Sequence, residues 1–170
     1  MKEEELSANH WLSVVYKERS HYMINRPLSS SSTVLAMEKK STTDVFMSIP
    51  PEDALEIARG RKTNVYRSYP LPATVRRIWF YTTAPLQYIE YVVCISQDGA
   101  GSNTGSKQFI YGYKIRQVWM LKQPIYLHQA ISRGILKAPP RKYCWATESF
   151  LDSCPFYRHY PVRGPKEIVW

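Results

Sequence analysis

The feature that most constrains the fold is a pair of β-rich runs, residues 75–83 and 86–96, that almost adjoin in the sequence. Both are dense in branched and aromatic side chains, which favour strands. A third long run covers residues 109–121, and shorter ones cover 45–49 and 63–69. About five strands in so short a chain predict that the core is built around one sheet.

Two short helices are predicted between these strands. Residues 51–53 place a proline and two acids at the start of the first helix, where both are favourable, and Gly60 is placed to end it. The second helix is expected over residues 125–133 and ends at Gly134. Strands with short helices predict the α+β class, as a small, partly closed β-barrel with short flanking helices.

The length of 170 residues favours one domain, which we place at residues 44–170. Residues 1–43 are interpreted as an N-terminal arm or linker, because they include the serine run 29–32. No apolar run reaches the roughly 20 residues of a membrane helix. The three cysteines have no metal-binding spacing, so we expect no metal or other cofactor, and a cytoplasmic protein.

The charge is strongly basic and unevenly distributed. Lys and Arg exceed Asp and Glu by nine, and residues 59–77 and 99–147 contain no acid. A wide positive potential attracts polyanions, and interleaved aromatic side chains suit base stacking, so nucleic acid is the expected partner. The alternative is an ordinary solvated basic surface. The candidate nucleic-acid contacts are Arg61, Lys62, Arg67, Arg76, Arg77, Lys114, Arg116, Arg141 and Lys142.

The segment Gly60-Arg61-Lys62-Thr63-Asn64-Val65-Tyr66-Arg67 resembles the signature of the ASCH domains of the PUA-like superfamily. That signature is Gly, any, Lys, any, any, Glu, any, Arg. Gly60, Lys62 and Arg67 match it, whereas Val65 occupies the glutamate position. The resemblance extends over roughly residues 44–146. It implies a PUA-like fold and RNA as a binding partner.

Lys62 has three possible roles. Neighbouring cations oppose protonation of an amine, and such a lysine can act as a base or nucleophile. It can instead contact phosphate, or be an exposed lysine at a helix exit. A nucleoside amidohydrolase among the ASCH relatives has a threonine where this chain has Val65, and valine has no oxygen to attack a carbonyl. The amidohydrolase function is therefore disfavoured.

Three runs, residues 75–85, 112–115 and 142–145, resemble the fungal arginine-containing cyclodipeptide synthases. That resemblance implies an enzyme that joins the arginyl group of arginyl-tRNA to a second amino acid, forming a diketopiperazine. Its partners would be aminoacylated tRNA and a small amino acid. The alternative is an RNA-binding module without catalysis. A deep pocket with an acid beside Lys62 would favour the enzyme, and an open groove would favour the module.

Candidate site residues for the synthase follow from what this chemistry needs. Glu90 lies in an apolar strand and is a candidate for recognising the guanidinium or accepting a proton. Its alternative is a salt bridge to Arg76 or Arg77. The remaining catalytic candidates are Lys62, Tyr81 and Thr82, and the remaining substrate-binding candidates are Tyr66, Thr83 and Trp145.

Overall fold

The computed structural model of the chain describes residues 38–97, 102–103 and 109–163. Most of the predicted arm, residues 1–37, lies outside the described residues. The elements follow the chain in the order β1 (Lys40–Ile49), α2 (Pro51–Ala58), β2 (Asn64–Arg67), β3 (Arg77–Thr82), β4 (Tyr88–Ser96), β5 (Ser102–Asn103), β6 (Phe109–Tyr126), α3 (Leu127–Ser132), β7 (Tyr143–Thr147), α4 (Glu148–Ser153), the 3-10 turn η1 (Phe156–Arg158) and β8 (Tyr160–Arg163).

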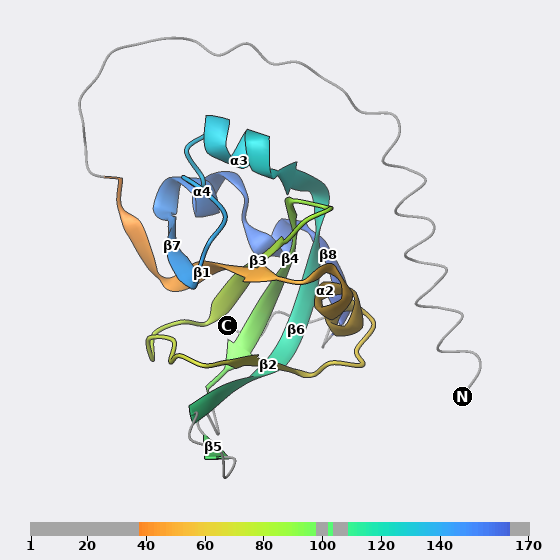
Figure 1. The fold of residues 1–170 in the computed structure, drawn as a ribbon. Coiled ribbons are helices and arrows are strands. Elements are labelled where there is room, and N and C mark those ends of the chain that lie inside the picture. Colours follow the sequence, from red (N-terminus) through yellow and green to blue (C-terminus); the bar gives the residue numbers. More distant parts are fainter. Residues whose placement is uncertain (1–37, 98–101, 104–108, 164–170) are drawn as a thin grey trace. The chain divides into compact units, whose positions relative to one another are not determined.

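One mixed sheet organises the described part of the chain (Figure 1). Its strand order is β2-β6-β4-β3-β1-β7, and β5 and β8 each add to β6. Strands β1 and β3 are parallel, and the other pairs are antiparallel. Among the described strands no backbone pairing joins β2 to β7, so the sheet does not close on itself. The expected α+β fold with a partly closed barrel is confirmed.

The two faces of the sheet bury different side chains, because neighbours along a strand point to opposite faces. Phe46, Trp79 and Trp119 belong to one cluster, which Ala130 of α3 and Phe150 of α4 complete. The neighbouring residues of the same strands are also fully buried and point to the other face. They include Val45, Met47, Ile78, Phe80 and Val118.

Helix α2 forms where the sequence predicts it. Pro51 stands in its first turn, where a proline is tolerated, followed by Glu52 and Asp53. Its buried side chains are Ala54, Ile57 and Ala58. Gly60 then takes φ 78°, a left-handed conformation that a side chain would resist, and the chain turns into β2.

The structure differs from expectation at the end of β6, and it has elements beyond Tyr143, where the sequence pattern predicts none. Strand β6 continues to Tyr126, because Ile125 and Tyr126 still pair with β4, and α3 begins two residues later than expected. The segment from Tyr143 onward has no periodicity in sequence. It nevertheless forms two strands, because β7 pairs with β1 and β8 pairs with β6.

Candidate nucleic-acid interface

Two cations that follow α2, Arg61 and Lys62, are paired with acids of that helix. Arg61 donates from Nε and Nη2 to the two carboxylate oxygens of Glu56. The Lys62 Nζ lies 2.6 Å from Asp53 Oδ2, and both side chains are about one-third exposed, at 32%. The arginine also holds the pKa of Glu56 below its usual value. The stretch that is acid-free in sequence is therefore partly neutralised in space.

Arg77 is held by a buried carboxylate. Asp44, with 0% exposure, accepts hydrogen bonds from Arg77 Nε and Nη2 at 2.7 Å and from Trp79 Nε1 at 3.0 Å. Burial alone would lower the pKa of Arg77. The hydrogen bond to Asp44 and the charge of Asp44 outweigh that effect, so the pKa of Arg77 is raised. The guanidinium also lies over the Phe156 ring, 4.8 Å from its centroid. Arg77 thus joins β1, β3 and η1, which is a structural role.

Three of the four catalytic candidates lie inside the protein. Glu90, Tyr81 and Thr82 are 2%, 2% and 1% exposed. Glu90 stands where the register of β4 shifts against both of its neighbours. Burial raises the pKa of the Tyr81 phenol, and the Thr82 hydroxyl has no hydrogen-bond partner within the described residues. Thr83, a substrate-binding candidate, is half-buried just after β3.

The open edges of the sheet, β2 and β7, meet through side chains that we call the aromatic seam: Arg67, Tyr69, Lys142, Tyr143 and Trp145. Arg67 donates to the Ser48 carbonyl oxygen at 2.9 Å, and the Tyr69 hydroxyl donates to the Lys142 carbonyl oxygen at 2.9 Å. The Tyr69 and Tyr143 rings stack with their centroids 6.3 Å apart, and Tyr143 and Trp145 form a T-shaped pair with centroids 6.1 Å apart.

Charge and burial act together in the aromatic seam. The Lys142 ammonium lies 5.6 Å from the centroid of the Tyr69 ring, within cation–π distance. Burial raises the pKa of Tyr69 despite the nearby Arg67, so its hydroxyl remains a donor at neutral pH. The aromatic seam brings together Arg67 and Lys142, which were predicted as nucleic-acid contacts, and Trp145, which was predicted as a substrate-binding residue. Tyr69 was not among the candidates, and only its place in the β-rich run 63–69 marked it.

A second group of candidates lies on the opposite face of β2. Asn64 pairs with Lys114 and Tyr66 pairs with Gly112, so these four residues point to one face. Lys114 and Tyr66 are exposed, and the nearby Arg116 is also exposed, with its Nε bonded to Ser96 Oγ at 3.1 Å. Strand β2 therefore separates two basic, aromatic surfaces.

Cations differ in how far neighbouring acids neutralise them. Within the described ranges, Lys114, Arg141 and Lys142 form no ion pair. Arg76 is exposed and donates to the Ala73 carbonyl oxygen at 2.9 Å. Among the candidate contacts, unneutralised charge therefore lies on β6 and just before β7, whereas Arg61 and Lys62 after α2 are paired with acids.

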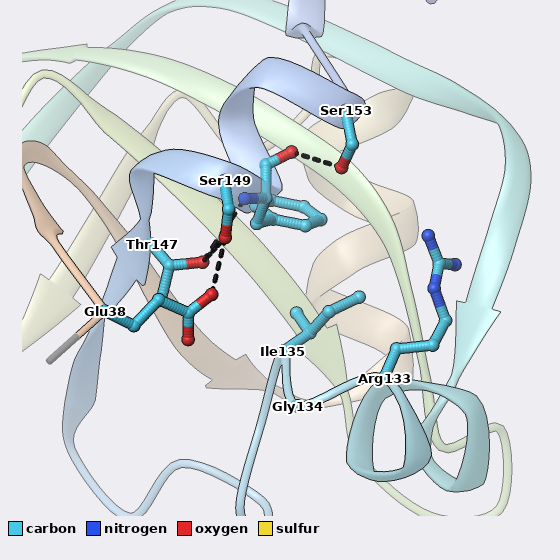
Figure 2. A pocket seen from close by; sticks show the side chains of 8 residues that line it. Glu38, Arg133, Gly134, Ile135, Thr147, Ser149 and Ser153 are labelled. Carbon is cyan, nitrogen blue, oxygen red and sulfur yellow. Dashed lines mark hydrogen bonds between the residues drawn. The ribbon is translucent and has the colours of Figure 1, made fainter. Parts of the chain in front are cut away.

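Two hollows open elsewhere on the surface. Figure 2 shows the first, where Glu38, Thr147 and Ser149 face Arg133 and Ile135 across a space of about 90 Å³. The second, of about 270 Å³, lies between the turn after β3 and helix α3. None of the candidate residues from the sequence lines either hollow. No group of three or more potential metal ligands occurs in the part of the chain that the structure describes.

The fold resembles solved ASCH structures. A mutant ASCH protein from Zymomonas mobilis superposes with a TM-score of 0.55 at 20% identity, covering 67% of this chain and 95% of that chain. The structure of ASCH from the same organism gives a TM-score of 0.53 at 22% identity, covering 66% and 93%. The chain therefore has an ASCH-like fold, as its motif predicted. No family model and no curated protein matches the sequence.

A membrane-crossing helix is not found among the described residues, none of whose helices is long and apolar enough.

Proposed function

We propose that this protein binds RNA, with the aromatic seam and its neighbouring cations as a principal contact surface. The observation that carries the proposal is the placing of Lys142 beside the Tyr69, Tyr143 and Trp145 rings. Arg141 is exposed next to it, and neither cation forms an ion pair within the described part of the chain. The ASCH-like fold and the formal charge of +9 support the same partner.

The physical basis is the release of counterions together with stacking. Lysine and arginine side chains that neutralise phosphates release condensed counterions, which favours binding at low salt. Aromatic rings at the same place offer flat surfaces to unstacked bases, and RNA recognition commonly uses such bases. A protein surface with cations alone would bind any polyanion. The rings in the seam are what direct the proposal toward nucleic acid.

The RNA that we propose is tRNA, the partner expected from the sequence. The test is fluorescence anisotropy with labelled tRNA and the double variant Arg141→Gln/Lys142→Gln. We expect the double variant to bind at least about tenfold more weakly, because two phosphate contacts are lost. Arg133→Gln is the control, because it removes an exposed charge at the hollow of Figure 2, which no residue of the aromatic seam lines. Equal affinities for all three proteins would contradict the proposal.

The tRNA-dependent cyclodipeptide synthase is the more specific prediction. In its favour, Asp53 is an acid beside Lys62, at 2.6 Å, but neither hollow described above is lined by these two residues. Against it, Glu90, Tyr81 and Thr82 are buried, so none of them is placed to meet a substrate at the surface. The decisive assay supplies arginine, arginyl-tRNA synthetase, tRNA, ATP and amino acids. An arginine-containing cyclic dipeptide would support the synthase, and tRNA binding without product would leave RNA binding as the function.

The amidohydrolase remains the weakest of the three predictions. Val65 stands at the position of the threonine in its motif, and its side chain is 2% exposed and pairs across to Tyr113. This residue contributes to the core.

A further inference from the structure

Tyr66 is the most exposed of the large aromatic side chains in the described residues, at 54%. It lies on the edge strand β2, directly opposite Gly112 of β6. A Cβ built on Gly112 would stand 3.0 Å from Tyr66 Cε1 and 3.3 Å from Cδ1. The Tyr66 ring thus packs against the backbone of Gly112, and this contact is possible because Gly112 has no side chain.

Positive charge continues from this ring along the same face. Lys114 is two residues beyond Gly112 on β6, and side chains two apart on a strand point the same way. Arg116 lies where the register of β4 and β6 shifts, and its Nε donates to Ser96 Oγ at 3.1 Å. Ser96 pairs with Lys114, so this contact keeps the guanidinium on the same face. Within the described ranges Lys114 forms no ion pair. We call Tyr66, Gly112, Lys114 and Arg116 the Tyr66 platform.

The platform is separate from the aromatic seam, because Tyr66 and Arg67 are neighbours on β2 and point to opposite faces. Arg67 turns toward the Ser48 carbonyl oxygen, whereas Tyr66 turns to solvent. A bound strand that used both surfaces would pass over the edge formed by β2.

We propose that the Tyr66 platform binds single-stranded RNA, with one unpaired base stacked on the Tyr66 ring and the adjoining phosphates on Lys114 and Arg116. This inference rests on the proposed RNA binding and specifies the kind of RNA that this face accepts. A base inside a duplex has both of its faces covered by its neighbours and cannot stack on a protein ring. An aromatic ring with cations on one side is the arrangement that single-strand binding proteins use.

A purely structural role for Tyr66 makes different predictions. An aromatic side chain that covers a glycine on the neighbouring strand stabilises that strand pair. If that were its whole role, Tyr66→Ala would lower the free energy of unfolding without changing which RNA is preferred. The preference for single strands over duplexes is therefore the informative measurement.

The experiment compares a labelled single-stranded RNA of about 16 nucleotides with the same strand annealed into a blunt duplex. Both are titrated with the full chain, Tyr66→Phe, Tyr66→Ala and Lys114→Gln. We expect tighter binding of the single strand, a loss of about tenfold for that strand in Tyr66→Ala, and little loss for Tyr66→Phe, which keeps the ring. Lys114→Gln should weaken binding and reduce the salt dependence by about one ion. Tyr157→Ala is the matched control, because Tyr157 is a similarly exposed tyrosine at 44% but lies in η1.

The outcomes separate this inference from the proposal on which it rests. If the full chain binds neither RNA, the proposed RNA binding fails. If the full chain binds RNA, two results would overturn the Tyr66 platform while RNA binding stands. In the first, Tyr66→Ala weakens binding of the single strand and of the duplex equally. In the second, it weakens binding of neither. A folded Tyr66→Ala variant, verified by circular dichroism, that loses only single-strand affinity would support the platform.

Discussion

The Arg67 guanidinium donates a hydrogen bond of 2.9 Å to the carbonyl oxygen of Ser48, which connects the edge strand β2 to the end of β1. A second donor group of the same arginine, Nη1, bonds to its neighbour's carbonyl oxygen, that of Tyr66, at 2.8 Å. Because backbone pairing does not join β2 to β7 in the described sheet, side chains of the aromatic seam connect its open edges. The seam is therefore both a structural connection and the proposed binding surface.

The first prediction concerns Arg67. In Arg67→Met the Ser48 carbonyl oxygen loses its charged donor, and we expect the free energy of unfolding to fall by about 1–3 kcal/mol. Arg67→Lys should recover only part of this loss, because one ammonium cannot reproduce the fork geometry that reaches two carbonyl oxygens. Urea unfolding followed by tryptophan fluorescence measures both variants. A change within about 0.5 kcal/mol for Arg67→Met would show that the contact between β2 and β1 adds little to stability.

The second prediction compares a buried ion pair with a partly exposed one. Asp44→Ala leaves Arg77 and the Trp79 indole N–H without their shared acceptor, and should cost about 3–5 kcal/mol. Asp53→Ala removes the partner of Lys62 where solvent screens both charges, and should cost about 1 kcal/mol or less. Urea unfolding of the two variants gives the comparison. Similar losses for both would contradict the different burial of the two pairs.

The third prediction is a pH dependence centred on His159. Its Nδ1 accepts from the Lys122 backbone N–H at 3.3 Å and its Nε2 lies 3.3 Å from Cys154 Sγ, an arrangement that suits the neutral ring. Burial, with a smaller contribution from the Lys122 charge, lowers the pKa of His159 below the ordinary 6.5. Below about pH 6.5 His159 therefore binds a proton more readily in the unfolded chain than in the folded one. The contribution of neutral His159 to the free energy of unfolding is complete above about pH 6.5 and is lost as the pH falls.

The measurement for this histidine is the free energy of unfolding of wild type and His159→Asn between pH 5 and 7.5, a range of about one unit or more around 6.5. The gap between the two proteins should narrow toward the acid end, because asparagine does not titrate. A gap that stays constant across the range would contradict the assignment.

The fourth prediction concerns thiol reactivity. Burial raises the pKa of Cys94 to about 11, although Arg77 opposes the rise, and burial also raises the pKa of Cys144 and Cys154. The thiolate is the reactive form, so all three should react with iodoacetamide at pH 7.5 far more slowly in the folded protein than in urea. Mass spectrometry of timed samples measures this. Fast labelling of a single cysteine in the folded protein would identify an activated thiol instead.

Much of the fold was predictable from local patterns. The run 75–83 contains β3, and the run 86–96 contains β4. Gly60 adopts the expected left-handed conformation just after the end of α2. These elements can be predicted because their signals are local in the sequence. The signals are branched residues in strands, a proline at the start of a helix and a glycine at its end. The strands β7 and β8 do not, because their pairing with β1 and β6 depends on contacts distant in the sequence.

The candidate site was less predictable, for a related reason. Counting charges along the chain suggested free cations at Arg61, Lys62 and Arg77. Folding brings Glu56, Asp53 and Asp44 to them, two from the preceding helix and one from the neighbouring parallel strand. Tyr69 was missed because its role arises only where the edges of the sheet approach, through its stack with Tyr143. Charge counted along the chain therefore did not show which of these cations the fold pairs with acids.

RNA binding at the aromatic seam is tested by the salt dependence of tRNA binding, measured for the full chain and for Arg141→Gln/Lys142→Gln. For the full chain we expect the logarithm of the association constant to fall linearly with the logarithm of salt concentration, as phosphate contacts require. The double variant should bind more weakly with a slope shallower by about 1 to 2, since two cations no longer meet phosphates. Absence of binding at low salt, or identical slopes for the two proteins, would contradict RNA binding at the aromatic seam.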